Sequence, residues 1–428
     1  MLASICDMDR HDNPITRKLS RLGPGLITGA SDDDPSGIAT YSQAGASFGT
    51  GTLWTAVVML PLMIVVQHIC AKIGMVSGRG LAGVLKTFYS KWILYPAVFG
   101  LIVANTINAG TDIAAIAAAI NMFVPVPIAL LVVPIAVVIV ALQIWGSYEF
   151  IVKVFKWLTL SLFAYIIATF LARPDWSAVL YATFVPQFQF SGAYITTIVA
   201  LLGTTISPYL FFWQASEEVE EEVAKGRDSV ESRKGATDAE LELEKWDTFT
   251  GMALSNVVAY FVILAAASTL FASGNHDIRS AAEAAQALRP LAGDAAGFLF
   301  AAGIIGTGLL GVPVLTGSSA YAVSETFGWK CSLDEKPRHA KRFYSVIAIS
   351  TLIGLLVNFS GIDPITALFW TAVINGVIAP PLLVVVMLVS NNERVMGKRT
   401  NSVITNIVGW LAAAAMFAAA IGMFLTLG

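Results

Sequence analysis

Long apolar segments recur along the whole chain, and short polar stretches separate them. Eleven of these segments have about the 20 residues that a helix needs to cross roughly 30 Å of hydrocarbon. Since lipid offers the backbone no hydrogen-bond partner, each segment is expected to be a helix. The pattern predicts an all-α membrane protein of eleven transmembrane helices. The predicted spans are 22–49, 52–76, 94–120, 126–146, 149–172, 190–215, 247–272, 294–325, 342–360, 363–390 and 402–427.

Composition supports this class. Hydrophobic residues make up 56% of the chain and charged residues only 13%, and the mean hydropathy is +0.72. Soluble domains carry about 25% charged residues, so a cytosolic enzyme of this length is excluded. The three cysteines lie far apart without a CxxC motif, which predicts neither a disulfide framework nor a zinc site. The polar N-terminal segment does not have the pattern of a signal peptide.

Basic residues indicate the orientation of the predicted helices. Loops on the cytoplasmic side of a membrane carry an excess of Lys and Arg. With the N-terminus in the cytoplasm, every Lys and Arg except Arg173, Arg279 and Arg289 falls on or beside an inside-facing segment. We therefore expect an integral protein of a prokaryotic inner or plasma membrane, with a cytoplasmic N-terminus and an outside C-terminus.

One polar insertion, 216–247, is rich in acidic residues. It holds twelve acids and five bases and follows the sixth predicted span. One interpretation is a solvated cytoplasmic helix that extends this span, because blocks of like charge usually lie in solvent. The other is an acidic vestibule or regulatory cation site at the inner mouth of the protein.

The first span contains an uncommon polar interruption. Asp32, Asp33 and Asp34 stand in the middle of an apolar segment and are followed by Pro35 and Gly37. A charge at mid-membrane costs roughly 2.5–3.5 kcal/mol on insertion scales, so it needs a partner or a function. Proline removes a backbone donor and disrupts the preceding turn. We expect a helix interrupted at 34–37 that offers oxygen atoms to a cation. The long apolar flanks argue against the alternative, a re-entrant or extramembrane segment.

The sixth span repeats this design. Gly203, Thr204 and Ser207 precede Pro208 in the middle of the apolar segment. Breaks at matching places in two halves indicate the inverted repeats of secondary transporters. The chain then divides into an N-terminus 1–21, a first repeat 22–172, a second repeat 173–390 with the acidic loop 216–247, and a last span in 391–428.

Polar residues also occur inside other spans. Asn105, Asn108 and Asp112 are spaced to lie on one face of the third span. The asparagines could join helices by hydrogen bonds, whereas a buried carboxylate such as Asp112 calls for a cation or a proton. Asn375 stands beside a glycine in the tenth span, and His68 in the second span is expected to be a core histidine.

At these motifs the chain resembles the NRAMP family of divalent metal transporters, which have a LeuT-like fold of 5+5 inverted repeats with broken helices 1 and 6. The family pattern Asp-Pro-Gly-Asn appears here as Asp34-Pro35-Ser36-Gly37. The family pattern Met-Pro-His appears as Ser207-Pro208-Tyr209, and Thr-Asp-Leu-Ala-Glu appears as 111–115 with Ala115 in place of Glu. A tenth-span Gln position corresponds to Ala372. These departures are similar to those of the NRAMP-related magnesium transporters.

The resemblance implies a metal site without sulfur. Losing the family's Met and Asn ligands leaves oxygen ligands and room for water, which suits Mg²⁺, a hard ion that keeps part of its hydration shell. Mn²⁺ also accepts oxygen ligands. The expected metal-site residues are Asp34, Ser31, Gly37, Thr204, Ser207 and Asp112. The expected pathway or supporting residues are Asp33, Asp32, Tyr209, Asn108, Asn105 and Asn375.

The predicted function is transport of largely hydrated Mg²⁺, with Mn²⁺ as a further cargo, into the cytoplasm without obligatory proton coupling. The main alternative is a proton-coupled Mn²⁺/Fe²⁺ importer. An amino-acid transporter is disfavoured because three acids at the break would repel a carboxylate substrate. A membrane enzyme or receptor is disfavoured because the chain has no HExxH or phosphate-loop motif. The expected partners are a divalent ion and the bilayer, with no cofactor, nucleic acid or obligatory protein partner.

Overall fold

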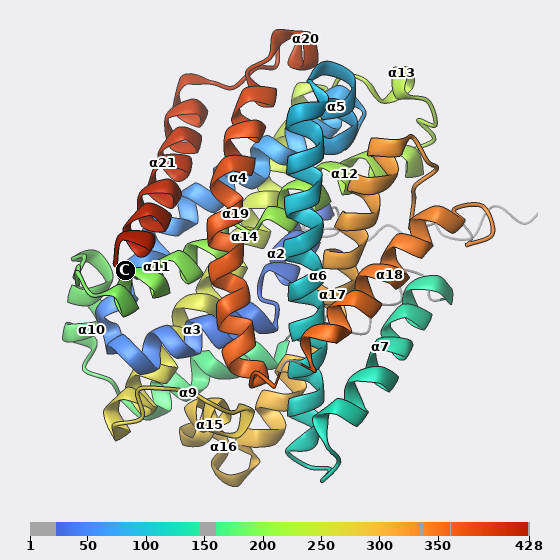
Figure 1. Cartoon of the computed structure of the whole chain (residues 1–428). Coiled ribbons are helices and arrows are strands. Elements are labelled where there is room, and N and C mark those ends of the chain that lie inside the picture. The colour runs from blue at the N-terminus through green and yellow to red at the C-terminus, as the bar shows by residue number, and fades with distance from the viewer. Residues whose placement is uncertain (1–22, 146–159, 334, 336, 360, 427–428) are drawn as a thin grey trace, which may run out of the picture.

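The computed structural model describes residues 23–145, 160–333, 335, 337–359 and 361–426, and this part of the chain contains helices and no strands (Figure 1). The prediction of an all-α protein is therefore confirmed. The α-helices are α2 (Pro24–Asp32), α3 (Pro35–Phe48), α4 (Trp54–Ser77), α5 (Leu81–Phe88), α6 (Lys91–Asn121), α7 (Ile128–Trp145), α9 (Ala164–Ala172), α10 (Trp176–Phe184), α11 (Gly192–Thr205), α12 (Pro208–Ala224), α13 (Val230–Arg233), α14 (Asp238–Thr269), α15 (Ala281–Ala285), α16 (Arg289–Ala292), α17 (Ala296–Phe327), α18 (Lys341–Val357), α19 (Pro364–Ser390), α20 (Glu393–Met396) and α21 (Val403–Thr426). The 3₁₀ turns are η1 (Gly49–Thr52), η2 (Leu160–Phe163), η3 (Phe271–Ser273), η4 (Gln286–Leu288) and η5 (Gly293–Ala295).

Eight helical segments in the described residues are long and apolar enough to cross a membrane. The first predicted span falls outside this set; it consists of the short helices α2 and α3, with three aspartates at their junction. The ninth corresponds to α18, which has 17 residues. The predicted fifth span lies partly outside the described residues, and its remaining part includes the shorter apolar helix 161–172. The predicted N-terminal segment 1–21 also lies outside the described residues.

Burial separates a central group of helices from a peripheral one. In the segment formed by α11 and α12, 89% of the most apolar stretch is buried, against 22% in α7 and 33% in α21. Figure 1 shows α2 and α3 in the interior of the bundle, with α7 and α21 at its sides. The broken helices are thus surrounded by protein, which is where irregular backbone is tolerated at membrane depth.

The first break lies slightly earlier than the sequence pattern suggested. Helix α2 ends at Asp32, and α3 already begins at Pro35 with Asp34 as its N-cap. The interruption is therefore at 33–34, and the expectation of a break at 34–37 was wrong at its C-terminal side. The reason is that proline is well tolerated in the first turn of a helix, so Pro35 starts the second half.

The second break lies where the pattern placed it. Helix α11 ends at Thr205 and α12 begins at Pro208, so that Ile206 and Ser207 connect the two halves. Both breaks therefore use the same local chemistry, a small polar or acidic N-cap position followed by a proline.

Glycines bring α2 and α14 into backbone contact. A Cβ atom on Gly29 would lie 2.3 Å from the carbonyl oxygen of Gly251, and one on Gly251 would lie 2.1 Å from that of Gly25. No side chain fits between these helices, and such close approach is typical of small residues in membrane bundles. The backbone of α2, the first half of the broken helix, therefore packs directly against the backbone of α14.

Candidate functional site

The carboxylate of Asp34 is oriented by three donors. Its Oδ1 accepts hydrogen bonds from the Gly37 amide at 2.8 Å and from the Ser36 hydroxyl at 2.6 Å, and its Oδ2 accepts one from Asn108 Nδ2 at 3.1 Å. Only 1% of the residue is exposed. The N-cap geometry of α3 and one side chain of α6 thus hold a negative charge at the break. The pattern had marked Asp34, Gly37 and Asn108, but not Ser36.

Asp112 is the second buried carboxylate beside this break. It is fully buried on α6, and neither carboxylate oxygen has a hydrogen-bond partner among the described residues. A Cβ atom on Gly311 of α17 would lie 3.1 Å from Asp34 Cβ and 3.8 Å from Asp112 Oδ2. Both aspartates therefore border the same surface of α17, where a glycine leaves room. Gly311 carried no signal in the sequence, because it is one of many glycines.

The second break contributes neutral oxygen atoms. The Ser207 hydroxyl donates to the carbonyls of Gly203 and Thr204, at 2.8 Å each, and Tyr209 donates to the carbonyl of Ser31 at 2.9 Å. The carbonyls of Ser31 and Thr204, two of the expected metal-site residues, thus each accept a hydrogen bond. A carbonyl oxygen has a second lone pair, so a ligand role stays open.

Gly37 lies in a narrow space between the two breaks. A Cβ atom there would be 3.2 Å from both the Asp32 carbonyl oxygen and the Thr204 hydroxyl. The structure thus brings Thr204 next to the start of α3. This spacing leaves little room for a larger side chain at position 37.

Two predicted pathway residues, Asn105 and Asn375, have surroundings that differ from those of Asn108. Asn105 donates to the Leu315 carbonyl and to the hydroxyls of Ser318 and Ser319, at 3.0, 2.7 and 3.0 Å, and so fastens α6 to α17. Asn375 is 1% exposed, and its amide has no hydrogen-bond partner among the described residues.

His68 differs from the expected core histidine. It is partly buried, and its ring nitrogen lies 2.6 Å from a carboxylate oxygen of Glu244. Glu244 belongs to the acidic insertion that follows the sixth span, so this insertion returns to α4. A contact between residues so far apart in the chain has no local signal in the sequence.

Asp32 and Asp33 face away from the Asp34 carboxylate, toward α14. The Ser255 hydroxyl lies 2.8 Å from Asp32 Oδ2 and 3.2 Å from Asp33 Oδ1. Ser255 was not singled out by the sequence, because a serine within an apolar span is common. The three consecutive aspartates are thus divided between two sides of the break.

No set of three or more His, Cys, Asp or Glu side chains in the described part of the chain converges to hold a metal ion. On the side of the first break that faces α17, the carboxylates of Asp34 and Asp112 and neutral oxygens are available. Mg²⁺ commonly binds to one or two carboxylates and keeps several waters, so this donor set suits a hydrated hard ion better than a fully enclosed one.

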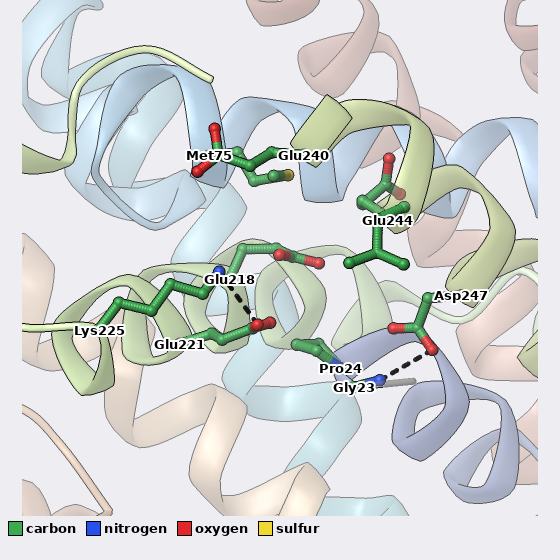
Figure 2. Close-up of a pocket in the computed structure, with 10 residues that line it drawn as sticks. Gly23, Pro24, Met75, Glu218, Glu221, Lys225, Glu240, Glu244 and Asp247 are labelled. Atoms are coloured by element: carbon green, nitrogen blue, oxygen red, sulfur yellow. Dashed lines mark hydrogen bonds and ion pairs between the residues drawn. The ribbon is translucent and has the colours of Figure 1, made fainter. Parts of the chain in front are cut away.

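A small acidic pocket lies at the start of α2, as Figure 2 shows. Asp247 of α14 accepts hydrogen bonds from the amides of Gly23, Gly25 and Leu26, at 3.0, 2.7 and 3.2 Å. A helix N-terminus attracts negative charge, so this carboxylate caps α2 from another helix. The cavity of about 40 Å³ is also lined by Glu218, Glu221, Glu240 and Glu244.

The acidic insertion is only partly the solvated helix of the first interpretation. Helix α12 does continue to Ala224, but Glu217, Glu218 and Glu222 are buried on it. The Gln214 amide donates to Glu218 at 2.9 Å, and the Thr28 hydroxyl donates to Gln214 at 2.5 Å. Acids from α12 and α14 therefore gather around the first half of the broken helix.

Residues 25–426 match the family model described as "Nramp: Natural resistance-associated macrophage protein-like". The chain belongs to the Nramp family. Membership makes this Nramp protein a transporter rather than an enzyme. It is 27% identical over 414 residues to the divalent metal cation transporter MntH of Deinococcus radiodurans, which covers 94% of this chain and 89% of the relative. It is 25% identical to MntH of Bacillus subtilis, covering 92% and 88%.

Solved structures confirm the predicted LeuT-like fold. The manganese transporter of Eremococcus coleocola, in complex with an aromatic bis-isothiourea compound, is 18% identical with a TM-score of 0.73, and the match covers 97% of this chain and 87% of that one. Mhp1, a nucleobase-cation-symport-1 family transporter in a closed conformation, is 14% identical with a TM-score of 0.57, covering 95% and 92%. At these identities the likeness concerns the fold alone.

Proposed function

We propose that this Nramp protein moves divalent metal ions into the cytoplasm by alternating access, with largely hydrated Mg²⁺ as the preferred cargo and Mn²⁺ as a further one. The relatives are named as divalent metal cation transporters, which supports the cargo class. The bilayer is the second partner, and the N-terminus lies in the cytoplasm, as the distribution of Lys and Arg favours. The 5+5 repeats, 22–172 and 173–390, supply the two elements that move.

The buried pair Asp34 and Asp112 carries the proposal for a metal site. Each aspartate is at most 1% exposed, and both border Gly311. A carboxylate inside a membrane protein is costly unless it binds a cation. Thr204 and Ser207 supply neutral oxygens beside them. Hard oxygen ligands favour Mg²⁺ or Mn²⁺ over softer ions.

We also propose that transport needs no obligatory proton flux. Position 209 holds a tyrosine, whose ordinary pKa of about 10 makes it a poor relay near neutral pH. The membrane potential is a sufficient driving force, because two charges crossing about 100 mV gain roughly 4.6 kcal/mol, from ~2.3 kcal/mol per charge.

Uptake by proteoliposomes tests both parts. Vesicles that contain the purified protein and a Mg²⁺ indicator should take up Mg²⁺ under an inside-negative potential, while a co-enclosed pH dye stays constant. Mg²⁺ uptake that does not exceed empty vesicles would refute the cargo. Acidification in step with Mg²⁺ uptake would refute the lack of coupling.

The second candidate is a proton-coupled Mn²⁺ importer. It is favoured by the fold match to a protein named as a manganese transporter. In the same vesicles this candidate predicts Mn²⁺ uptake that acidifies the lumen and little uptake of Mg²⁺.

A further inference from the structure

A larger cavity lies away from both breaks, at the end of the bundle where α5 and α13 are found (Figure 1). Its volume is about 840 Å³, within the range of roughly 300–1,000 Å³ that is typical of pockets for small organic ligands. The turn between α4 and α5, the helices α12 and α13, the end of α17 and the segment after it line this cavity. With the orientation proposed above, the cavity lies on the cytoplasmic side of the membrane.

Three basic side chains from separate segments line this cavity. They are Arg79 in the α4–α5 turn, Lys86 on α5 and Arg233 on α13. None of them forms an ion pair with a carboxylate in the described part of the chain. The Arg233 guanidinium donates only to main-chain carbonyls, at 2.9 to 3.3 Å, and Lys86 Nζ donates to the Glu325 carbonyl at 3.3 Å. Arg79 is partly buried, and its guanidinium donates no hydrogen bond to the described residues, so its five N–H groups are available to a ligand.

The acids that line the same cavity have partners of their own, with one exception. Glu325 accepts hydrogen bonds from two amides at the start of α5, at 2.9 Å each, and Arg79 acts on it electrostatically without an ion pair. Glu220 accepts a hydrogen bond from a serine hydroxyl at 2.7 Å, and Glu335 forms an ion pair with a lysine. Asp228 is exposed, and its carboxylate has no partner among the described residues. Basic groups without a carboxylate partner thus outnumber such carboxylates, and this excess of positive charge attracts an anion.

The two arginines border one turn of the backbone. A Cβ atom on Gly78 would lie 3.0 Å from Arg233 Cβ, and one on Gly83 would lie 3.4 Å from Arg79 Cβ. The Arg233 side chain also donates to the Gly78 carbonyl, across 155 positions of the chain. The fold therefore brings two guanidinium groups to the α4–α5 turn, and planar guanidinium groups bind phosphate oxygens through paired N–H donors.

We propose that Arg79, Arg233 and Lys86 form a binding site for the phosphate group of an organic anion, which is either a soluble phosphate compound or the headgroup of an anionic lipid. The cavity is much larger than a phosphate ion, so it has room for the organic part of such a ligand. Basic pockets on the cytoplasmic side of membrane helices suit lipid headgroups, and a soluble compound can enter the same cavity from the cytoplasm. The site is separate from the breaks and does not depend on which ion is transported.

Two probes distinguish the sources of the phosphate group. The full chain in phosphatidylcholine nanodiscs is titrated with inorganic pyrophosphate in metal-free buffer, and the heat of binding is measured by calorimetry. The full chain in nanodiscs that also contain phosphatidylglycerol is examined by native mass spectrometry for retained phosphatidylglycerol. Binding of pyrophosphate assigns the site to a soluble phosphate compound, and retention of phosphatidylglycerol assigns it to a lipid headgroup. If neither probe binds, the proposal is overturned.

Variants of the lining residues test whether the probe occupies this cavity. Arg79→Gln combined with Arg233→Gln should weaken binding by at least about tenfold, because two charge-assisted contacts are lost. Lys86→Gln should weaken it several-fold. Asp228→Asn removes the carboxylate without a partner and should strengthen binding several-fold, a gain that damage to the fold would not produce.

Lys234→Gln is the matched control. It removes the same charge from an exposed residue that follows Arg233 in the chain but does not line the cavity, so binding should stay unchanged. Thermal unfolding in nanodiscs checks each variant. If the double arginine variant does not fold, Lys86→Gln and Asp228→Asn decide the question through their opposite effects. Unchanged binding in the lining variants, or a loss in Lys234→Gln equal to that in Lys86→Gln, would overturn the proposal.

Discussion

The two broken helices share a backbone design and differ in charge. The break between α2 and α3 carries three consecutive aspartates, and donors from α3, α6 and α14 reach them. The break between α11 and α12 carries no charge, and its Ser207 hydroxyl bonds to carbonyls of its own helix. The first interruption thus carries carboxylates, and the second carries only neutral hydroxyl and carbonyl oxygens.

A hydrogen bond joins the two breaks. Tyr209, at the start of α12, donates to the Ser31 carbonyl near the end of α2 at 2.9 Å. A phenol bonded to a carbonyl orders the charged break without adding charge to it. The first break therefore carries the charge, and the second supports it through a neutral contact.

The largest effect is expected at the charged break. Asp34→Ala removes the carboxylate that three donors orient, so Mg²⁺ uptake should fall by at least about tenfold, the scale seen when a metal site loses a ligand or its support. Uptake by the purified variant in proteoliposomes is the measurement, with thermal stability as the check on folding. Uptake near the parent value would place the cargo site elsewhere.

A smaller loss is expected for Asp112→Ala. This residue borders the same glycine as Asp34, but its carboxylate accepts no hydrogen bond from the residues that the structure describes. Uptake should fall less than in Asp34→Ala, because the oriented carboxylate of Asp34 remains at the break. A loss as large as that of Asp34→Ala would mean that both aspartates bind the ion equally.

The surface of α17 offers a further test. Gly311→Ala would place a methyl group 3.1 Å from Asp34 Cβ, closer than ordinary contact, so the aspartate must move by a few tenths of an ångström. We expect the affinity for Mg²⁺ to fall several-fold while the protein stays folded. Gly100→Ala is the matched control, since its nearest atom would lie at an ordinary 3.6 Å. Equal behaviour of both variants would argue against a site beside Gly311.

Selectivity should change when the family's ligands are restored, one at each break. Ser207→Met with Gly37→Asn adds a thioether and an amide, so Mn²⁺ and Cd²⁺ should compete better and Mg²⁺ should transport worse. The 3.2 Å clearances at Gly37 limit the gain from Asn, and Ser207→Met alone is expected to give most of it. Competition of Mg²⁺ uptake by Mn²⁺, Cd²⁺ and Ca²⁺ measures this. A parent that already prefers Cd²⁺ would refute the magnesium assignment.

The smallest effect is expected away from both breaks. His68→Ala removes a contact to Glu244 that lies near the acidic pocket rather than at the aspartates. Mg²⁺ uptake should stay within about twofold of the parent, because this contact lies apart from the aspartates of the first break. A larger loss would assign the pocket a part in transport.

The sequence by itself determined the class of the protein, the two breaks and the central aspartate. Apolar segments of membrane length and paired Gly/Pro interruptions are local signals, because they follow from the length of a helix and from the chemistry of proline. The same reasoning placed the first break slightly late, since it did not foresee that Pro35 would start a helix.

Only the tertiary structure decided how the aspartates are divided and which neighbours they have. Ser255 and Gly311 come from α14 and α17, more than 200 residues from Asp32 and Asp34 along the chain. Their roles depend on which helix faces are packed together, and a serine or glycine in an apolar span has no local signal for that. Asn105 bonds to α17, and Asp247 caps α2. Both contacts join helices that are distant in the chain, so no local pattern predicts them.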